Sequence, residues 1–299
     1  MRRAVLLLLP LLLALAAAPR SGAYEPMALR IPAHPAERDA GGPGELDALL
    51  RLPAGAGPHR AVVLLHGCAG MRASSGAMMA RDDDWGARLA ALGYAVLHLD
   101  SLSPRGERSL CGQGDDRRVR MSVERARDAY AALAFLQARA DIRADAVALM
   151  GWSNGGGTVL WSLSRDSRAR PAGLRHDFAA GIAFYPGCRT LSQRREAWRP
   201  VAPVLLLVGE ADDWTPAPPC AELAARTGDA LELRLYPGAH HDFDAPDMKL
   251  RVRSGVGATA SGTATLGTDP AAREDALRRV PAFLAARPKT GDGARITPE

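Results

Sequence analysis

The clearest catalytic pattern in the sequence is Gly151-Trp152-Ser153-Asn154-Gly155, which reads G-x-S-x-G. An apolar run at 147–150, typical of a buried strand, precedes it, and residues 158–163, which can open a helix, follow. A serine on a sharp strand-to-helix turn is forced out above the sheet, while flanking glycines let the neighbouring backbone pack closely. The pattern predicts that Ser153 is a nucleophile; the alternative is a glycine-rich turn with a bystander serine.

A neutral serine needs a base within hydrogen-bond reach, and the base needs a carboxylate to orient it. Asp212 follows the strand expected at 204–208, and His241 follows the strand expected at 231–236. The resulting order Ser-Asp-His is the order of α/β-hydrolases. Asp213 and His240 are the adjacent rivals, but neighbouring loop residues usually point in different directions. Only one aspartate and one histidine are therefore expected to face each other, and the spacing leaves open whether the acid is Asp212 or Asp213 and whether the base is His241 or His240.

Two clusters of acidic and histidine residues resemble metal sites. The first is the run Asp82-Asp83-Asp84, which precedes an amphipathic segment at 85–92, so we interpret it as a solvated acidic helix N-terminus. The second is less favoured as a metal site because consecutive ligands rarely converge on one ion; it consists of His240, His241, Asp242 and Asp244. We expect neither a metal nor a cofactor.

The elements that must position these residues are strands alternating with helices. Strands are expected at 61–65, 93–100, 147–150, 179–185, 204–208 and 231–236, and helices at 85–92, 119–140 and 269–286. This alternation predicts an α/β fold with a mostly parallel, doubly wound sheet covered by helices on both faces. Residues 45–52 are expected to form an edge strand or short hairpin, and 253–268 a mobile loop. The charged residues of 119–140 are expected on a solvated helix face.

The strand at 61–65 ends in the small-residue loop His66-Gly67-Cys68-Ala69-Gly70. A loop of this kind, at the carboxyl end of a strand, can aim backbone N–H groups at a developing oxyanion. His66 is expected to orient the loop by hydrogen bonding rather than to react.

Taken together, these motifs resemble the dienelactone hydrolase family of α/β-hydrolases over roughly residues 45–287. The resemblance rests on the nucleophile elbow, which is the turn Gly151–Gly155, and on three further motifs: the His66-Gly67-Cys68 loop, Gly209-x-x-Asp212 before Pro216, and Tyr236-Pro237-Gly238-Ala239-x-His241-x-Phe243. It implies that Asp212 is the acid and His241 the base, and that the N–H groups of Cys68 and Asn154 form the oxyanion hole. Dienelactone hydrolases proper use a cysteine nucleophile, whereas this chain has Ser153.

Arg105 lies in the loop after Asp100, at the same edge of the expected sheet as Ser153. Some members of the resembled family bind acidic substrates through arginine, so Arg105 is a candidate for clamping a substrate carboxylate. The alternative is a surface turn whose arginine pairs with Glu107 or solvent.

The N-terminus has the pattern of an export signal. A basic start at 1–3, an apolar stretch at 4–18 and small residues at 21–23 predict a signal peptide at 1–23. A retained anchor is the alternative, although the apolar stretch is shorter than the usual span of about 20 residues. We expect a periplasmic or secreted protein with one domain at 24–287, a disordered tail at 288–299, and no membrane insertion after cleavage.

Export makes the four cysteines candidates for disulfides. The strands that precede them are expected to be neighbours in pairs, which predicts the bonds Cys68–Cys111 and Cys188–Cys220; free thiols are the alternative.

The formal charge is +5 and the isoelectric point is near 9.3. Three arginines and no acid lie within 1–23, so +2 remains without that segment. The remaining basic residues are scattered, which argues against nucleic-acid binding. The sequence thus predicts an exported serine hydrolase of small carboxylic esters, lactones or thioesters. A peptidase-like hydrolase or a non-catalytic binding protein of the same fold is the alternative, and the sequence does not indicate the oligomeric state.

Overall fold

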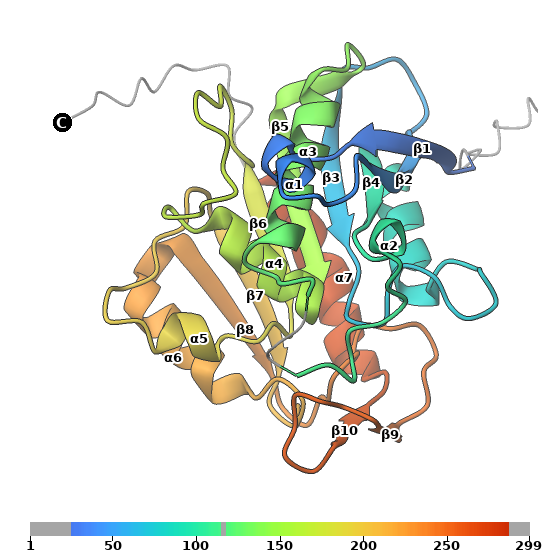
Figure 1. Ribbon diagram of the computed structural model, residues 1–299. Coiled ribbons are helices and arrows are strands. Elements are labelled where there is room, and N and C mark those ends of the chain that lie inside the picture. The colour runs from blue at the N-terminus through green and yellow to red at the C-terminus, as the bar shows by residue number, and fades with distance from the viewer. Residues whose placement is uncertain (1–24, 115–117, 287–299) are drawn as a thin grey trace, which may run out of the picture.

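An eight-stranded sheet forms the centre of the computed structural model, which describes residues 25–114 and 118–286 (Figure 1). The strand order is β1-β2-β4-β3-β5-β6-β7-β8; β3 to β8 are parallel, and β1 and β2 are antiparallel. The strands are β1 (Met27–Pro32), β2 (Glu45–Arg51), β3 (His59–Leu65), β4 (Tyr94–Asp100), β5 (Ile142–Trp152), β6 (Ala180–Phe184), β7 (Val204–Gly209) and β8 (Leu231–Tyr236). The segments 1–23 and 288–299, predicted as signal peptide and tail, lie outside the described residues.

Helices cover both faces of the sheet, as the alternation of elements predicts. The helices are α1 (Pro35–Asp39), α2 (Ala80–Ala91), α3 (Glu124–Gln137), α4 (Asn154–Leu163), α5 (Arg189–Ser192), α6 (Ala217–Thr227) and α7 (Pro270–Ala285). One apolar cluster joins the sheet to α3, α4 and α6, and a second joins the other face to α2 and α7. Burial on both faces explains why the central strands read as continuous apolar runs.

The path of the chain through the sheet determines where a site can form. From β3 the chain moves outward to β4, then crosses back over β3 to β5 and continues in the other direction to β8. The direction of winding therefore reverses between β3 and β5, and a crevice opens at the carboxyl ends of strands at such a point. The loops after β3 and β5 begin at His66 and Ser153 respectively.

Four local expectations need correction. Within the expected segment 45–52, residues 45–51 form β2, which is not an edge strand, because β1 pairs along its outer side. The segment 253–268 is largely a hairpin of β9 (Arg251–Ser254) and β10 (Thr263–Leu266) rather than a mobile loop. The charged side chains of α3 are not all solvated, since Arg125 and Asp128 are fully buried. Asp82 in α2 is also buried, because it pairs with Arg81.

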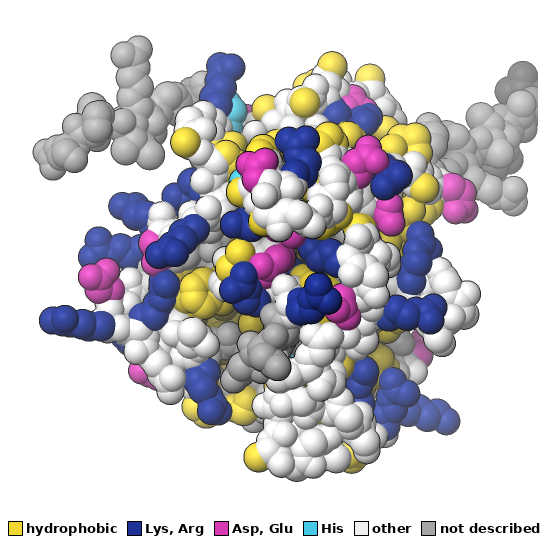
Figure 2. All heavy atoms as spheres, in the orientation of Figure 1, with side chains coloured by type: hydrophobic (Ala, Val, Ile, Leu, Met, Phe, Trp, Pro, Cys, Tyr) yellow, Lys and Arg dark blue, Asp and Glu magenta, His cyan; other side chains and the backbone are white. Residues whose placement is uncertain are grey.

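The predicted disulfides Cys68–Cys111 and Cys188–Cys220 are both present. The first joins the loops after β3 and β4, and the second joins the residue before α5 to α6. In the described ranges, no helix is long and apolar enough to cross a membrane. On the face shown in Figure 2, Lys and Arg side chains are spread over the surface with acidic side chains among them.

Candidate active site

Ser153 lies on a strained turn between β5 and α4. Its backbone has φ 51° and ψ −115°, a positive φ that a residue with a side chain adopts at a cost of about 1–3 kcal/mol. The turn needs glycine on both sides. A Cβ on Gly151 would lie 2.5 Å from the Gly155 carbonyl group, and a Cβ on Gly155 would collide with the carbonyl oxygen of Leu65.

Backbone hydrogen bonds fix this turn against the neighbouring strand. The Ser153 N–H donates to the Phe184 carbonyl at 2.9 Å, and the Ser153 carbonyl accepts from the Gly157 N–H at 2.8 Å. The serine is 8% exposed. The G-x-S-x-G spacing therefore has a steric cause, because only glycine allows the β5–α4 turn to pack this closely on β3.

Asp212 and His241, the predicted acid and base, are in direct contact. His241 Nδ1 and Asp212 Oδ2 are 2.7 Å apart, and both residues are almost fully buried. Asp212 Oδ1 accepts from the backbone N–H groups of Trp214 and Thr215 at 2.8 Å, and Oδ2 accepts from the Thr215 hydroxyl at 2.9 Å. The carboxylate is thus held by its own turn, and it orients the imidazole.

Electrostatics within this pair favour the charged form of both groups. Burial opposes ionisation of Asp212, but the attraction of His241 and hydrogen bonds from its turn lower the pKa of Asp212 below its usual value. Burial also opposes protonation of His241, but Asp212 outweighs it, so the pKa of His241 is raised above 6.5. A base with a stabilised imidazolium form is suited to taking a proton from a serine.

The rival residues Asp213 and His240 are directed elsewhere. Asp213 accepts from the N–H of Thr265 at 2.8 Å and from its hydroxyl at 2.9 Å, and so anchors the β9–β10 hairpin. His240 Nδ1 is buried without a hydrogen-bond partner among the described residues. Within 25–114 and 118–286, no three metal-ligating side chains gather at one point; of the suspected cluster, Asp242 pairs with Arg81 at 2.7 Å.

Two aromatic rings enclose the imidazole of His241. The Tyr185 ring lies 4.5 Å from it and the Trp214 ring 4.7 Å, between ring centroids. These rings restrict the orientation of the imidazole. Neither was identified from the sequence, although Trp214 stands two residues after Asp212.

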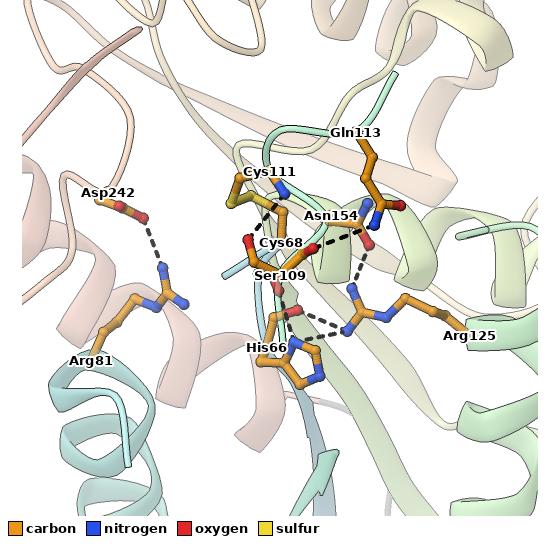
Figure 3. The surroundings of a disulfide bond; sticks show 10 residues. His66, Cys68, Arg81, Ser109, Cys111, Gln113, Arg125, Asn154 and Asp242 are labelled. Carbon is orange, nitrogen blue, oxygen red and sulfur yellow. Dashed lines mark hydrogen bonds and ion pairs between the residues drawn. A yellow bond between two sulfur atoms is a disulfide. The ribbon is translucent and has the colours of Figure 1, made fainter. Parts of the chain in front are cut away.

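Cys68 and Asn154, the expected oxyanion-hole residues, lie in the loop after β3 and at the start of α4. Asn154 is the first residue of α4, so its N–H has no acceptor within the helix. Both residues line the same cavity as Ser153. The buried Arg125 links Asn154 to the start of the loop that carries Cys68: it donates to the Asn154 side-chain oxygen at 2.5 Å and to the His66 carbonyl at 2.8 Å (Figure 3).

His66 orients the loop before Cys68. Its Nε2 accepts from the Ser101 N–H at 3.2 Å, so Nδ1 carries the proton and donates to the Gly67 carbonyl at 2.7 Å. Burial and the nearby Arg125 charge lower the pKa of His66 to about 3. His66 is therefore neutral at ordinary pH, in agreement with an orienting role.

Among the described residues, two adjoining cavities meet at Ser153. The larger has a volume of about 360 Å³ and is lined by apolar and polar residues, including Met121, Cys188, Arg189 and Trp214. The smaller, of about 60 Å³, holds Ser153, His241 and three arginines, Arg81, Arg251 and Arg253. A substrate with its reacting bond at Ser153 would extend into both.

Arg105 does not contribute to either cavity, which corrects the expected carboxylate clamp. Its guanidinium donates to both Asp128 oxygens at 2.8 and 2.9 Å, to Glu37 at 2.8 Å and to the Ser101 carbonyl at 2.7 Å. Only 8% of the side chain is exposed. The alternative of a surface arginine paired with Glu107 is also incorrect, because this arginine is a buried structural cation.

The parallel sheet, the serine on its strand-to-helix turn and the Asp–His pair after later strands define the α/β-hydrolase fold. Solved structures with this fold are similar over most of the chain. The dienelactone hydrolase-like promiscuous phosphotriesterase P91 from metagenomic libraries has a TM-score of 0.56 and 17% identity, covering 88% of this chain and 99% of that one. Esterase 2 of Thermogutta terrifontis has a TM-score of 0.56 and 15% identity, covering 81% and 89%. Dipeptidyl peptidase 4 of Porphyromonas gingivalis has a TM-score of 0.59 and 17% identity, covering 88% and 35%.

The chain belongs to the dienelactone hydrolase family, whose model matches residues 46–287. Membership places it among hydrolases that act on ester bonds. A Bradyrhizobium protein described as a probable 2-oxo-3-(5-oxofuran-2-ylidene)propanoate lactonase is 29% identical over 177 residues. That match covers 52% of this chain and 64% of the relative, less than two thirds of its length.

Proposed function

We propose that the protein is an exported serine hydrolase that cleaves a carboxylic ester or lactone through an acyl-enzyme on Ser153. The observation that carries this proposal is the 2.7 Å contact between His241 and Asp212, beside a serine on a strained turn that lines the same cavity as His241. A thioester is a chemically similar substrate.

In the first half-reaction, Ser153 Oγ attacks the carbonyl carbon while its proton passes to His241 Nε2, the ring nitrogen not bound to Asp212. The N–H groups of Cys68 and Asn154 stabilise the negative oxygen of the tetrahedral intermediate. His241 then returns the proton to the leaving alkoxide, which departs as an alcohol and leaves Ser153 acylated. Water attacks the acyl group with His241 as base, and the carboxylic acid and free serine are released.

The arginines of the smaller cavity favour a substrate that carries a carboxylate. Arg81 pairs with Asp82 and Asp242, whereas Arg251 and Arg253 have no acidic partner in the described part of the chain. The Bradyrhizobium relative is described as acting on a lactone of this charge, a propanoate. Arg253→Ala should then raise KM for a carboxylate-bearing ester several-fold more than for its neutral amide analogue. Equal changes in KM for the two substrates would contradict the proposal that the substrate carries a carboxylate.

A peptidase of the same fold is the second candidate, because a dipeptidyl peptidase is among the similar structures. Hydrolysis of graded p-nitrophenyl esters, lactones and dipeptide p-nitroanilides by the wild type and Ser153→Ala distinguishes the candidates. We expect ester and lactone hydrolysis that Ser153→Ala lowers at least about 10³-fold with the fold unchanged. Activity on peptides alone, or full activity in Ser153→Ala, would contradict the proposal.

Export is supported by the predicted signal at 1–23 and by the two disulfides, which persist in oxidising compartments. The mature protein recovered from cells should begin at Tyr24, as read by N-terminal sequencing. An intact Met1 terminus in the cytoplasmic fraction would contradict export.

A further inference from the structure

A fully buried carboxylate lies behind the active site. Asp244 follows His241 by three residues and is 0% exposed. Its Oδ2 accepts from the indole N–H groups of Trp85 and Trp152, each at 2.8 Å, and its Oδ1 accepts from the Tyr185 hydroxyl at 2.5 Å. These donors come from α2, from the last residue of β5 and from the residue that follows β6. A buried carboxylate is costly unless its oxygens are paired, and here both are.

Each of two donors joins Asp244 to a part of the proposed catalytic apparatus. Trp152 immediately precedes Ser153, so its bond to Asp244 ties the nucleophile turn to the loop that carries His241. The Tyr185 ring packs against the His241 imidazole, so its hydroxyl ties that ring to the same loop. A serine and its base react well only when held within roughly 0.5 Å of the productive geometry.

Two arginines near Asp244 also bind Asp244 or its partner Tyr185. Arg81 donates to the Tyr185 hydroxyl at 3.2 Å and to Asp242 at 2.7 Å, and it also pairs with Asp82. Arg273 of α7 donates to the backbone carbonyl of Asp244. Because the Tyr185 hydroxyl accepts from Arg81, its own proton is free to point at Asp244. Burial raises the pKa of Asp244, but the ionised form of this carboxyl only accepts and so fits all three donors.

We propose that Asp244 is a positioning residue that holds the nucleophile turn and the histidine loop in register through Trp152 and Tyr185. It touches no reacting atom. The inference rests on the proposed function of Ser153 and His241.

The two tryptophans provide a matched test. Both donate to the same oxygen at the same distance and are buried to within 1%, but only Trp152 is joined to the nucleophile. Trp85→Phe and Trp152→Phe should lower the melting temperature by similar amounts. Trp152→Phe should in addition lower kcat at least about 10-fold with KM within about twofold, while Trp85→Phe keeps kcat within about threefold. Equal kcat in the two variants would overturn the proposal.

Asp244→Asn tests the carboxylate itself, since an amide has one acceptor oxygen and cannot satisfy all three donors. The control is Asp275→Asn, because Asp275 also accepts from a tyrosine hydroxyl, that of Tyr236, at 3.0 Å. We expect the kcat of Asp244→Asn to fall at least about 10-fold and that of Asp275→Asn to stay near wild type. If Asp244→Asn does not fold, Tyr185→Phe is measured in its place. This change removes only the hydroxyl, so we expect kcat to fall below wild type by less than the factor of about 10 expected for Asp244→Asn. An unchanged kcat in the folded variant would overturn the proposal.

Crystal structures of Trp85→Phe and Trp152→Phe separate failure of this inference from failure of the proposed function. If the wild type hydrolyses no ester, the proposed function fails, but the structures still report the geometry. We expect Ser153 to move relative to His241 in Trp152→Phe and to stay in place in Trp85→Phe. No movement in either variant would overturn the positioning role.

Discussion

Adjacent residues of the same type have different surroundings in this site. Asp212 contacts His241, whereas Asp213 binds Thr265 of β10. The difference arises from the turn after β7, whose backbone N–H groups converge on the Asp212 carboxylate and direct it inward. Asp212 and His241 were predicted from the resemblance to the dienelactone hydrolase motifs, because the spacing after the strands did not separate them from their neighbours. Nothing in the sequence indicated that Asp213 binds Thr265, because the two residues are 52 positions apart.

The two aspartates make a matched comparison. Asp212→Asn should lower kcat by about 10²–10⁴-fold, because the imidazole loses its orientation and the charge that stabilises its cation. Asp213→Asn should change kcat by no more than about threefold, since its bonds hold the hairpin. Steady-state hydrolysis of one ester by both variants checks this, and a larger loss in Asp213→Asn would show that the acid is misassigned.

The pH dependence of hydrolysis follows from the charge state of His241. Burial lowers its pKa, but Asp212 outweighs burial, so the pKa lies above 6.5. The base must be neutral to accept a proton, so kcat/KM should fall as pH decreases through a midpoint above 6.5. In Asp212→Asn the raising charge is gone while burial remains, so the midpoint should move to lower pH. A midpoint that does not move between wild type and variant in a pH–rate profile would exclude His241 as the titrating base.

At the scale of elements, the site is assembled from loops that follow β3, β5, β7 and β8. The strands were predictable because buried parallel strands read as apolar runs. The β9–β10 hairpin was not, because its strands are four residues each and lie in a sequence rich in Gly, Thr and Ala. Three of the four disulfide cysteines, Cys68, Cys111 and Cys188, line the larger cavity, so the disulfides hold the segments that border it.

The two disulfides should differ in their effect on catalysis. They close chain segments of 43 and 32 residues, and each should contribute about 4 kcal/mol of stability in the chain-entropy model. Replacing both cysteines of Cys68–Cys111 with serine should also lower kcat at least about 10-fold, because the Cys68 N–H is a proposed oxyanion donor. The same change at Cys188–Cys220 should keep kcat within about threefold. Melting curves and kinetics measure both; equal kcat losses would contradict the oxyanion assignment.

At the scale of the whole molecule, ion pairs of two arginines connect α1, near the start of the described chain, to α3. Arg105 joins Glu37 of α1 to Asp128 of α3, and Arg127 also pairs with Glu37. The sequence could not show these pairs, because Arg105 is 68 residues from Glu37 and 23 residues from Asp128. An isolated charged residue in a sequence predicts an exposed side chain. Family, fold and the residues of the elbow were predictable because they depend on local spacing and glycine sterics. Buried charges depend on partners brought together only by the fold.

Removing this connection should cost stability rather than substrate binding. Arg105→Ala leaves the buried Asp128 unpaired and should lower the free energy of unfolding by about 3–5 kcal/mol. In the variant that remains folded, KM for carboxylate-bearing and neutral esters should change by the same factor. Chemical denaturation and paired kinetics provide the two readouts, and a selective rise in KM for the anionic ester would restore Arg105 as a substrate-binding residue.

The central claim is that Ser153 is an activated nucleophile, and covalent labelling tests it most directly. Wild-type protein is incubated with a fluorophosphonate probe, and peptide mass spectrometry locates the adduct. We predict one adduct per chain, on the peptide containing Ser153, and at least about 10²-fold slower labelling in His241→Ala. Labelling of His240→Ala should proceed at close to the wild-type rate. No adduct, an adduct on another residue, or equal labelling of His241→Ala and wild type would contradict the account.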